Sequence, residues 1–148
     1  MEQRRSGLKF QVAFVADPAL AGQRGLRYFM KWLTFFFVLF IVLIIVLADL
    51  GQLGILGAIN KIPFGDKAGH FILYGILTLL VDLTLIRALP NRDAKLIVVC
   101  MGLVFILIIG LEEYSQQFFP KRTYDLVDLT FSYLGVISFS WVSLKIKR

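Results

Sequence analysis

The sequence predicts an all-α fold, a bundle of four membrane-spanning helices. Of its 148 residues 58% are hydrophobic, and the mean hydropathy is +0.78, whereas a soluble domain has about 45–50% apolar residues. The apolar residues form long runs, which suits helices that cross a bilayer. Most of the basic residues behind the net charge of +6 flank these runs. The charge therefore indicates orientation in a membrane rather than nucleic-acid binding.

Residues 1–31 are predicted to form a basic cytoplasmic tail. Six Lys and Arg residues lie in this stretch, and we expect Asp17-Pro18, Gly22 and Gly25 to break any long helix. Such a tail could lie on anionic lipid headgroups. The apolar run that follows is too long for the core of a secretory signal, and no small-residue cleavage site closes it.

Residues 32–148 are predicted to be the membrane domain, with spans at about 32–50, 68–89, 95–118 and 125–144. The first span is apolar almost all round, so we expect an anchor helix with much lipid contact. Nineteen residues at about 1.5 Å each suit a bilayer core of about 30 Å. Residues 51–65 contain several glycines among apolar residues, and we expect this connection to skim the interface.

The second span carries a polar stripe. His70, Tyr74, Thr78 and Asp82 follow one another at intervals of four residues, so they share one slowly turning helix face. Such a stripe is expected to face the bundle interior or a water-filled cavity. Asp82 could be structural, capping a neighbouring helix or pairing with Arg87, or it could be functional. A proton path along the stripe is conceivable, but four helices are a small scaffold for a transporter.

The third and fourth spans are joined by a polar turn. The third apolar run, 96–111, is short, so its helix should continue to Phe119 and end at Pro120. This places Glu113, Gln116 and Gln117 on one face. The last span repeats polar and small residues on one face that should pack inward, namely Asp125, Asp128, Ser132, Gly135 and Ser138.

The distribution of positive charge predicts both termini in the cytoplasm. Twelve of the 16 Lys and Arg residues lie in the N-terminal tail, the turn near Asn91 and the C-terminus, against four on the other side. This orientation gathers a polar cluster at the outer end of the bundle. Its members, our candidate site residues, are Asp66, Lys67, His70, Tyr74, Glu113, Gln116, Arg122, Asp125 and Asp128.

The residue types in this cluster allow three interpretations. It could be a salt-bridged network, in which Arg122 pairs across the turn with Glu113, Asp125 and Asp128. It could be a headgroup site, in which Arg122 and Lys67 bind an anionic group and the carboxylates bind sugar hydroxyls or an amine. It could be catalytic, with His70 as general base beside Arg122, although no serine or cysteine nucleophile signature is present and catalytic residues stay unknown.

No metal or cofactor is predicted. His70, Glu113 and Asp125 could bind a metal on paper, but the chain has one histidine and no ligand pair with metal-site spacing. Cys100 is the only cysteine, which excludes an internal disulfide, and we expect it to be a packing residue.

Two sequence motifs carry a family resemblance: Asp66-Lys67-x-x-His70-x-x-x-Tyr74, and Glu113-x-x-Gln116-x-Phe118-x-Pro120-x-Arg122-x-x-Asp125-x-x-Asp128 with Gly135 seven residues further on. Together they resemble the VanZ-like family of bacterial integral membrane proteins. The resemblance covers about residues 60–140. Two positions depart from the family pattern: Tyr114-Ser115-Gln116 stands where His-Gln is common, and Ser132 stands where Asn is usual. The resemblance implies a small protein of the bacterial cell envelope, in a family whose founding member is linked to low-level teicoplanin resistance.

The sequence therefore favours a multi-pass protein of the bacterial plasma membrane. Its outer cluster is expected to bind an envelope lipid headgroup, a lipid-linked wall precursor or a partner protein, with a possible effect on glycopeptide susceptibility. One alternative is a membrane enzyme that acts on a phosphate-bearing lipid or a polyprenyl-linked substrate. Another is a purely structural or assembly protein. The oligomeric state stays open.

Overall fold

The computed structural model describes residues 18–52, 64–120 and 122–146, and this part of the chain is helical, without strands. Its elements are α2 (Pro18–Asp49), α4 (Gly65–Ala88), α5 (Ala94–Ser115), the short 3₁₀ helix η1 (Gln116–Phe118) and α6 (Leu126–Ile146). The four long helices are each long and apolar enough to cross a membrane. The predicted fold class is confirmed at this level.

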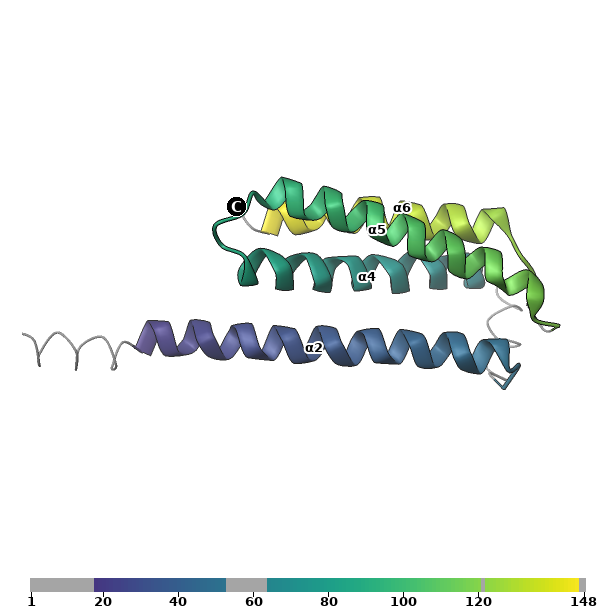
Figure 1. Ribbon diagram of the computed structural model, residues 1–148, viewed down its shortest axis with the longest axis horizontal. Helices are drawn as coiled ribbons and strands as arrows, with labels where there is room; N and C mark the ends of the chain where they lie inside the picture. Colours follow the sequence, from purple (N-terminus) through teal and green to yellow (C-terminus); the bar gives the residue numbers. More distant parts are fainter. Residues whose placement is uncertain (1–17, 53–63, 121, 147–148) are drawn as a thin grey trace, which may run out of the picture.

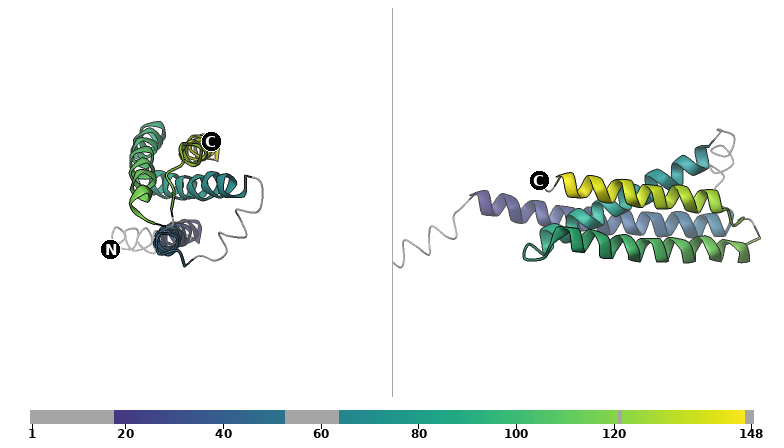
Figure 2. Two further views of the ribbon diagram at one scale, coloured as in Figure 1. Left: turned by 90° about the vertical axis from the view of Figure 1, so that its right-hand side faces the viewer. Right: turned by 90° about the horizontal axis from the view of Figure 1, so that it is seen from above.

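Helix α4 is the central element of the bundle. It packs most extensively on α6 and also contacts α2 and α5. Successive long helices run in opposite directions, with α2 alongside the group formed by α4, α5 and α6 (Figures 1 and 2). Among the α2 side chains that the structure describes, the buried hydrophobic ones are Met30, Ile41 and Ala48, so most of the apolar surface described for this helix is exposed. This matches the expected anchor helix.

The predicted helix break at Gly22 and Gly25 is wrong. Helix α2 begins at Pro18 rather than Trp32, and both glycines lie inside it. Proline is tolerated in the first turn, where its missing N–H has no intrahelical role. A glycine costs a helix only about 1 kcal/mol relative to alanine, and the following run from Leu26 onward propagates the helix. Residues 1–17 of the predicted tail, and most of the predicted interfacial connection (53–63), lie outside the described residues.

The α4–α6 contact depends on glycines. A methyl group at Gly135 would collide with the Phe71 carbonyl oxygen, and one at Gly75 would collide with the Phe139 ring. The two backbones can therefore approach closely, as expected for helices that pack by van der Waals contact in lipid. Gly135 and Ser132 are buried, as the small-residue face predicted, but Ser138 is exposed. The prediction was wrong for Ser138 because the repeat drifts off the contact face after about two turns.

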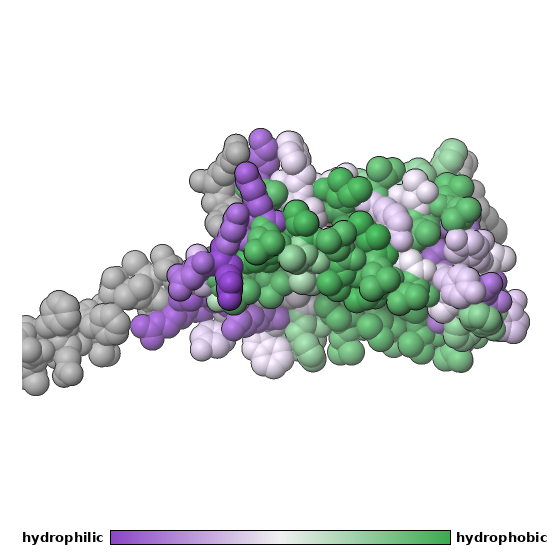
Figure 3. All heavy atoms as spheres, turned by 45° about the horizontal axis from the view of Figure 1, so that its top comes forward, coloured by the Kyte–Doolittle hydropathy of each residue, from purple (hydrophilic) through white to green (hydrophobic). Residues whose placement is uncertain are grey.

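The third helix continues past its apolar run as predicted. Helix α5 ends at Ser115, and η1 extends it to Phe118. A hydrophobic band covers the middle of the molecule, and hydrophilic residues gather at both ends (Figure 3). This distribution is typical of a protein that crosses a membrane.

Candidate functional site

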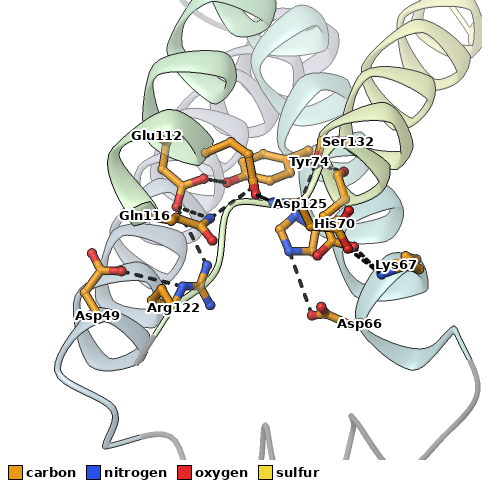
Figure 4. Close-up of polar contacts among 12 residues, drawn as sticks. Asp49, Asp66, Lys67, His70, Tyr74, Glu112, Gln116, Arg122, Asp125 and Ser132 are labelled. Atoms are coloured by element: carbon orange, nitrogen blue, oxygen red, sulfur yellow. Dashed lines mark hydrogen bonds and ion pairs between the residues drawn. The ribbon is translucent and has the colours of Figure 1, made fainter. Parts of the chain in front are cut away.

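Polar side chains from all four long helices meet at one end of the bundle. This end holds the start of α4, the end of α5, η1, the connection to α6 and the end of α2 (Figures 1 and 4). The side chains form two groups with different surroundings. We call the first the inner clasp and the second the rim cluster. The inner clasp comprises Asp49, Tyr74, Glu112, Glu113, Gln116 and Arg122, and the rim cluster comprises Asp66, Lys67, His70, Asp125, Asp128 and Ser132.

Glu112 is the hub of the inner clasp. The Tyr74 hydroxyl donates to Glu112 Oε2 at 3.0 Å, and Gln116 Nε2 donates to Glu112 Oε1 at 3.0 Å. Arg122 Nη2 lies 4.0 Å from the same Oε1. A carboxylate with donors on both oxygens is well stabilised away from water. Glu112 thus joins α4, α5 and the connection to α6.

Glu113 closes the turn between α5 and α6. Its side chain is 1% exposed. Its Oε1 accepts the backbone N–H of Asp125 at 3.0 Å, and its Oε2 accepts from Gln116 Nε2 at 3.1 Å. This buried carboxyl therefore fixes where α6 begins, which is a structural role.

Arg122 does not pair with Glu113, Asp125 or Asp128, as the sequence had suggested. Its Nε lies 3.7 Å from Asp49 Oδ1 at the end of α2, and its second contact is Glu112. The prediction failed because it considered partners close in sequence, whereas α2 ends beside the connection to α6 in space. Arg122 therefore ties the peripheral helix α2 to the rest of the bundle.

Lys67 holds the start of α6 in the rim cluster. Its Nζ lies 2.8 Å from Asp128 Oδ1 and 3.2 Å from Asp125 Oδ2. Asp125 also caps α6, because its Oδ1 accepts the Val127 N–H at 2.8 Å. The Val127 N–H and, next, the Lys67 ammonium hold the pKa of Asp125 below its usual range.

The hydrogen bonds of Ser132 fix the orientation of His70. Ser132 Oγ donates its single proton to the Asp128 carbonyl oxygen at 2.9 Å and lies 3.1 Å from His70 Nδ1. Ser132 must then accept from His70, so Nδ1 carries a proton. The other ring nitrogen, Nε2, lies 3.9 Å from Asp66 Oδ1, which is too long for a hydrogen bond.

Ser132, His70 and Asp66 have the order of a Ser-His-Asp triad, but their arrangement lacks the properties of one. Ser132 has no exposed surface, and its proton is engaged by a backbone carbonyl. A nucleophile has to reach its substrate and transfer its proton to the base. The contact serves helix packing and histidine orientation.

The rim cluster offers donor atoms of the kind that bind cations. One ligand atom each of Asp66, His70 and Asp128 lies within 4.8 Å of the others. A divalent ion could use this geometry, and the set differs from the one that the sequence suggested on paper. Lys67 already supplies one positive charge to Asp128. We therefore assign no metal to these three residues.

The polar stripe of the second span is not a continuous hydrogen-bonded path in the described structure. The Thr78 hydroxyl donates to the Tyr74 carbonyl oxygen, and the Tyr74 hydroxyl donates to Glu112, which is not part of the stripe. Asp82 is bonded to Ser143 on α6 and forms no ion pair with Arg87. These contacts give no support to a proton path along the stripe.

The structure brings all nine sequence-predicted site residues to this end of the bundle, in two groups. It adds three residues that the predicted set omitted, namely Asp49, Glu112 and Ser132. Two of these residues could have been predicted as members of the site. Asp49 is a carboxylate at the end of an apolar span, and Glu112 lies within the polar turn. Nothing in the sequence indicated that Ser132 would contact His70.

Comparisons with known proteins found no matching family model, no matching curated protein and no matching solved structure. The candidate site therefore has to be interpreted from its own geometry.

Proposed function

We propose that this chain is a multi-pass protein of the bacterial plasma membrane with both termini in the cytoplasm. We further propose that its rim cluster binds the amine-bearing headgroup of an envelope lipid or of a lipid-linked cell-wall precursor. The membrane assignment is supported by the four apolar helices and their flanking charges. The link to the envelope is supported by the residue pattern that resembles the VanZ-like family.

The observation that carries the ligand chemistry is the excess of carboxylates at this end. Among the described residues, Asp66, Asp125 and Asp128 face a single lysine in the rim cluster, while Asp49, Glu112 and Glu113 face a single arginine in the inner clasp. These carboxylates would attract an ammonium group. Close to the membrane surface, where screening by water is reduced, such attraction is stronger than in bulk solvent.

The same contacts argue against an anionic headgroup as the primary ligand. Lys67 and Arg122 were the residues expected to bind one, and both are already in contact with carboxylates. A phosphate would have to displace those partners and would lie beside uncompensated acids. An amine could instead contact the Asp66 carboxylate, which forms no ion pair with a described lysine or arginine, without displacing Lys67.

The rim cluster is accessible where the inner clasp is closed. The side chains of Asp66 and Asp125 are 40% and 37% exposed, whereas Glu113 and Gln116 are buried. A binding site has to be reached from outside, so the rim cluster is the part of the polar end available for a ligand. The inner clasp then supports it by fixing the helix ends.

Lipid retention in native mass spectrometry tests this proposal. The purified chain is offered phosphatidylethanolamine or phosphatidylglycerol of matched acyl chains. We expect retention of the ethanolamine lipid to fall several-fold in Asp66→Asn and Asp128→Asn, with glycerol lipid retention unchanged. Asp93→Asn is the matched control, because Asp93 caps α5 at the opposite end of the bundle. Equal retention of the two lipids by the wild type would contradict the proposal.

A chelator separates an amine from a metal ion as the bound cation. Removal of divalent cations should leave ethanolamine lipid retention unchanged. Loss of lipid retention on chelation would instead show that a bridging metal ion is the cation bound at the rim cluster. In cells, Asp66→Asn should alter teicoplanin susceptibility in the same direction as deletion of the gene, while Asp93→Asn should not.

A further inference from the structure

Asp82 is a carboxyl group buried inside the bundle, away from the polar end. It lies on α4 and has no exposed surface. It lies 12 residues beyond His70, the nearest rim-cluster residue on α4, which is about 18 Å along the helix. Asp82 belongs to neither the inner clasp nor the rim cluster.

The surroundings of Asp82 contain hydroxyls but no balancing charge. Ser143 Oγ on α6 lies 3.1 Å from Asp82 Oδ2. Asp82 Oδ1 and the Ser140 hydroxyl are both buried without a hydrogen-bond partner. No described basic side chain forms an ion pair with Asp82. An ionised carboxylate in such a place is costly, because neither water nor a cation offsets its charge.

The two contacts of the Ser143 hydroxyl bear on the protonation state of Asp82. The Ser143 hydroxyl has one proton, and its oxygen lies 2.7 Å from the Ser140 carbonyl oxygen, nearer than Asp82 Oδ2. A carbonyl oxygen can only accept, so the shorter contact takes the Ser143 proton. With its proton directed mainly to that carbonyl oxygen, Ser143 Oγ can accept in its contact with Asp82, and a neutral carboxyl group would supply the proton of that bond.

We propose that Asp82 is an intramembrane proton-binding site, held as a neutral carboxylic acid that donates a hydrogen bond to Ser143. The acid joins α4 to α6 at the point where Ser140 and Ser143 face it. A hard metal ion is a poorer ligand for this site, since such ions take about six or more oxygen ligands and the site offers one carboxyl and two hydroxyls. The inference is independent of the proposed headgroup site.

Infrared spectroscopy of the full chain in lipid bilayers at neutral pH tests the proposal. A protonated carboxyl has a carbonyl band that a carboxylate lacks. We expect this band in the wild type and its loss in Asp82→Asn, which keeps the size of the side chain and can still donate to Ser143. Asp93→Asn is the control and should retain the band. A difference spectrum in which Asp82→Asn removes carboxylate bands instead would overturn the proposal.

A second pair of variants leaves Asp82 in place, so the test does not depend on the folding of Asp82→Asn. Ser143→Ala removes the proposed acceptor and should shift the protonated-carboxyl band to higher frequency. Ser138→Ala, a change at an exposed serine of the same helix, should leave the band where it is. An unmoved band in Ser143→Ala would show that the acid does not donate to Ser143. Carboxylate bands that depend on added sodium would show a metal ion in place of the proton.

Discussion

At the scale of single residues, the polar end separates into side chains that hold the bundle and side chains that face outward. Burial decides between these roles. Glu113 and Gln116 are enclosed and fully engaged with neighbours, whereas Asp66 and Asp125 remain partly exposed. The sequence places both kinds in one polar stretch and cannot distinguish them. A headgroup site and a structural network are therefore both compatible with this end, on different residues.

The Tyr74 hydroxyl should contribute measurably to stability. Tyr74→Phe removes its hydrogen bond to Glu112 and leaves the rest of the ring in place. We expect a loss of about 1–3 kcal/mol in the free energy of unfolding, since the acceptor is a partly buried carboxylate. Tyr114→Phe is the control, because Tyr114 is exposed on the same end. Equal melting temperatures for both variants in detergent would show that the Glu112 hub does not stabilise the fold.

Asp125 should make stability depend on acid. Its pKa is lowered in the folded state, so its stabilising contribution is present above the ordinary Asp pKa of about 3.9 and is lost as the pH falls through the lower folded value. Asp125→Asn keeps a cap for α6 but loses the ion pair with Lys67. Its melting temperature should therefore fall less steeply below pH 4 than that of the wild type. Parallel curves for the two proteins would contradict this assignment.

At the scale of elements, the contact between α4 and α6 organises the molecule. It includes Gly75, Gly135 and the pair of Asp82 with Ser143, and it carries the rim cluster at one end. Helix α2 buries few residues, and it is attached through the hydrogen bonds of Thr34 with Leu80 and Thr84 of α4 and through the Arg122–Asp49 ion pair. A change in the α4–α6 spacing should therefore affect the candidate site more than a change on α2.

Gly135→Ala should destabilise the bundle. The added methyl group would meet the Phe71 carbonyl oxygen, which belongs to the backbone and cannot rotate away. We expect a cost of about 1–3 kcal/mol, typical of overpacking. Gly102→Ala on α5 is the matched control, because no neighbouring atom lies within 4 Å of its new methyl group, and it should be neutral or slightly stabilising. Thermal unfolding in detergent measures both, and equal stability for the two variants would exclude a close α4–α6 approach.

At the scale of the whole molecule, the distribution of positive charge predicts that the candidate site lies on the outer face. Six basic residues lie in the first 31 positions, and others flank the turn near Asn91. The polar end with the rim cluster is opposite that turn (Figure 1). The headgroup proposal depends on this orientation, since wall precursors act outside the cell.

Cysteine labelling tests the orientation. In a Cys100→Ala background, Thr123→Cys should react with an impermeant maleimide added to intact cells, because Thr123 is exposed beside the rim cluster. Asn91→Cys, exposed at the opposite end, should react only after permeabilisation. The reverse pattern would place the candidate site in the cytoplasm and remove the basis of the envelope proposal.

The sequence by itself predicted the helical class, the presence of four helices long and apolar enough to span a membrane, and the end of the bundle at which polar residues gather. These follow from local quantities, namely the length of apolar runs, turn residues and helical periodicity. It missed the start of α2, because weak helix breakers are overridden by the run that follows them.

Only the tertiary structure decided which polar side chains are partners. Arg122 meets Asp49 and not the acids nearer in sequence, and Ser132 orients His70 across two helices. Such pairings depend on how the helices lie in space, and the spacing of residues along the chain does not specify this arrangement. The same holds for burial, which closes the inner clasp around Glu113, leaves Asp66 at the rim and encloses Asp82 without an ion pair to any described basic residue.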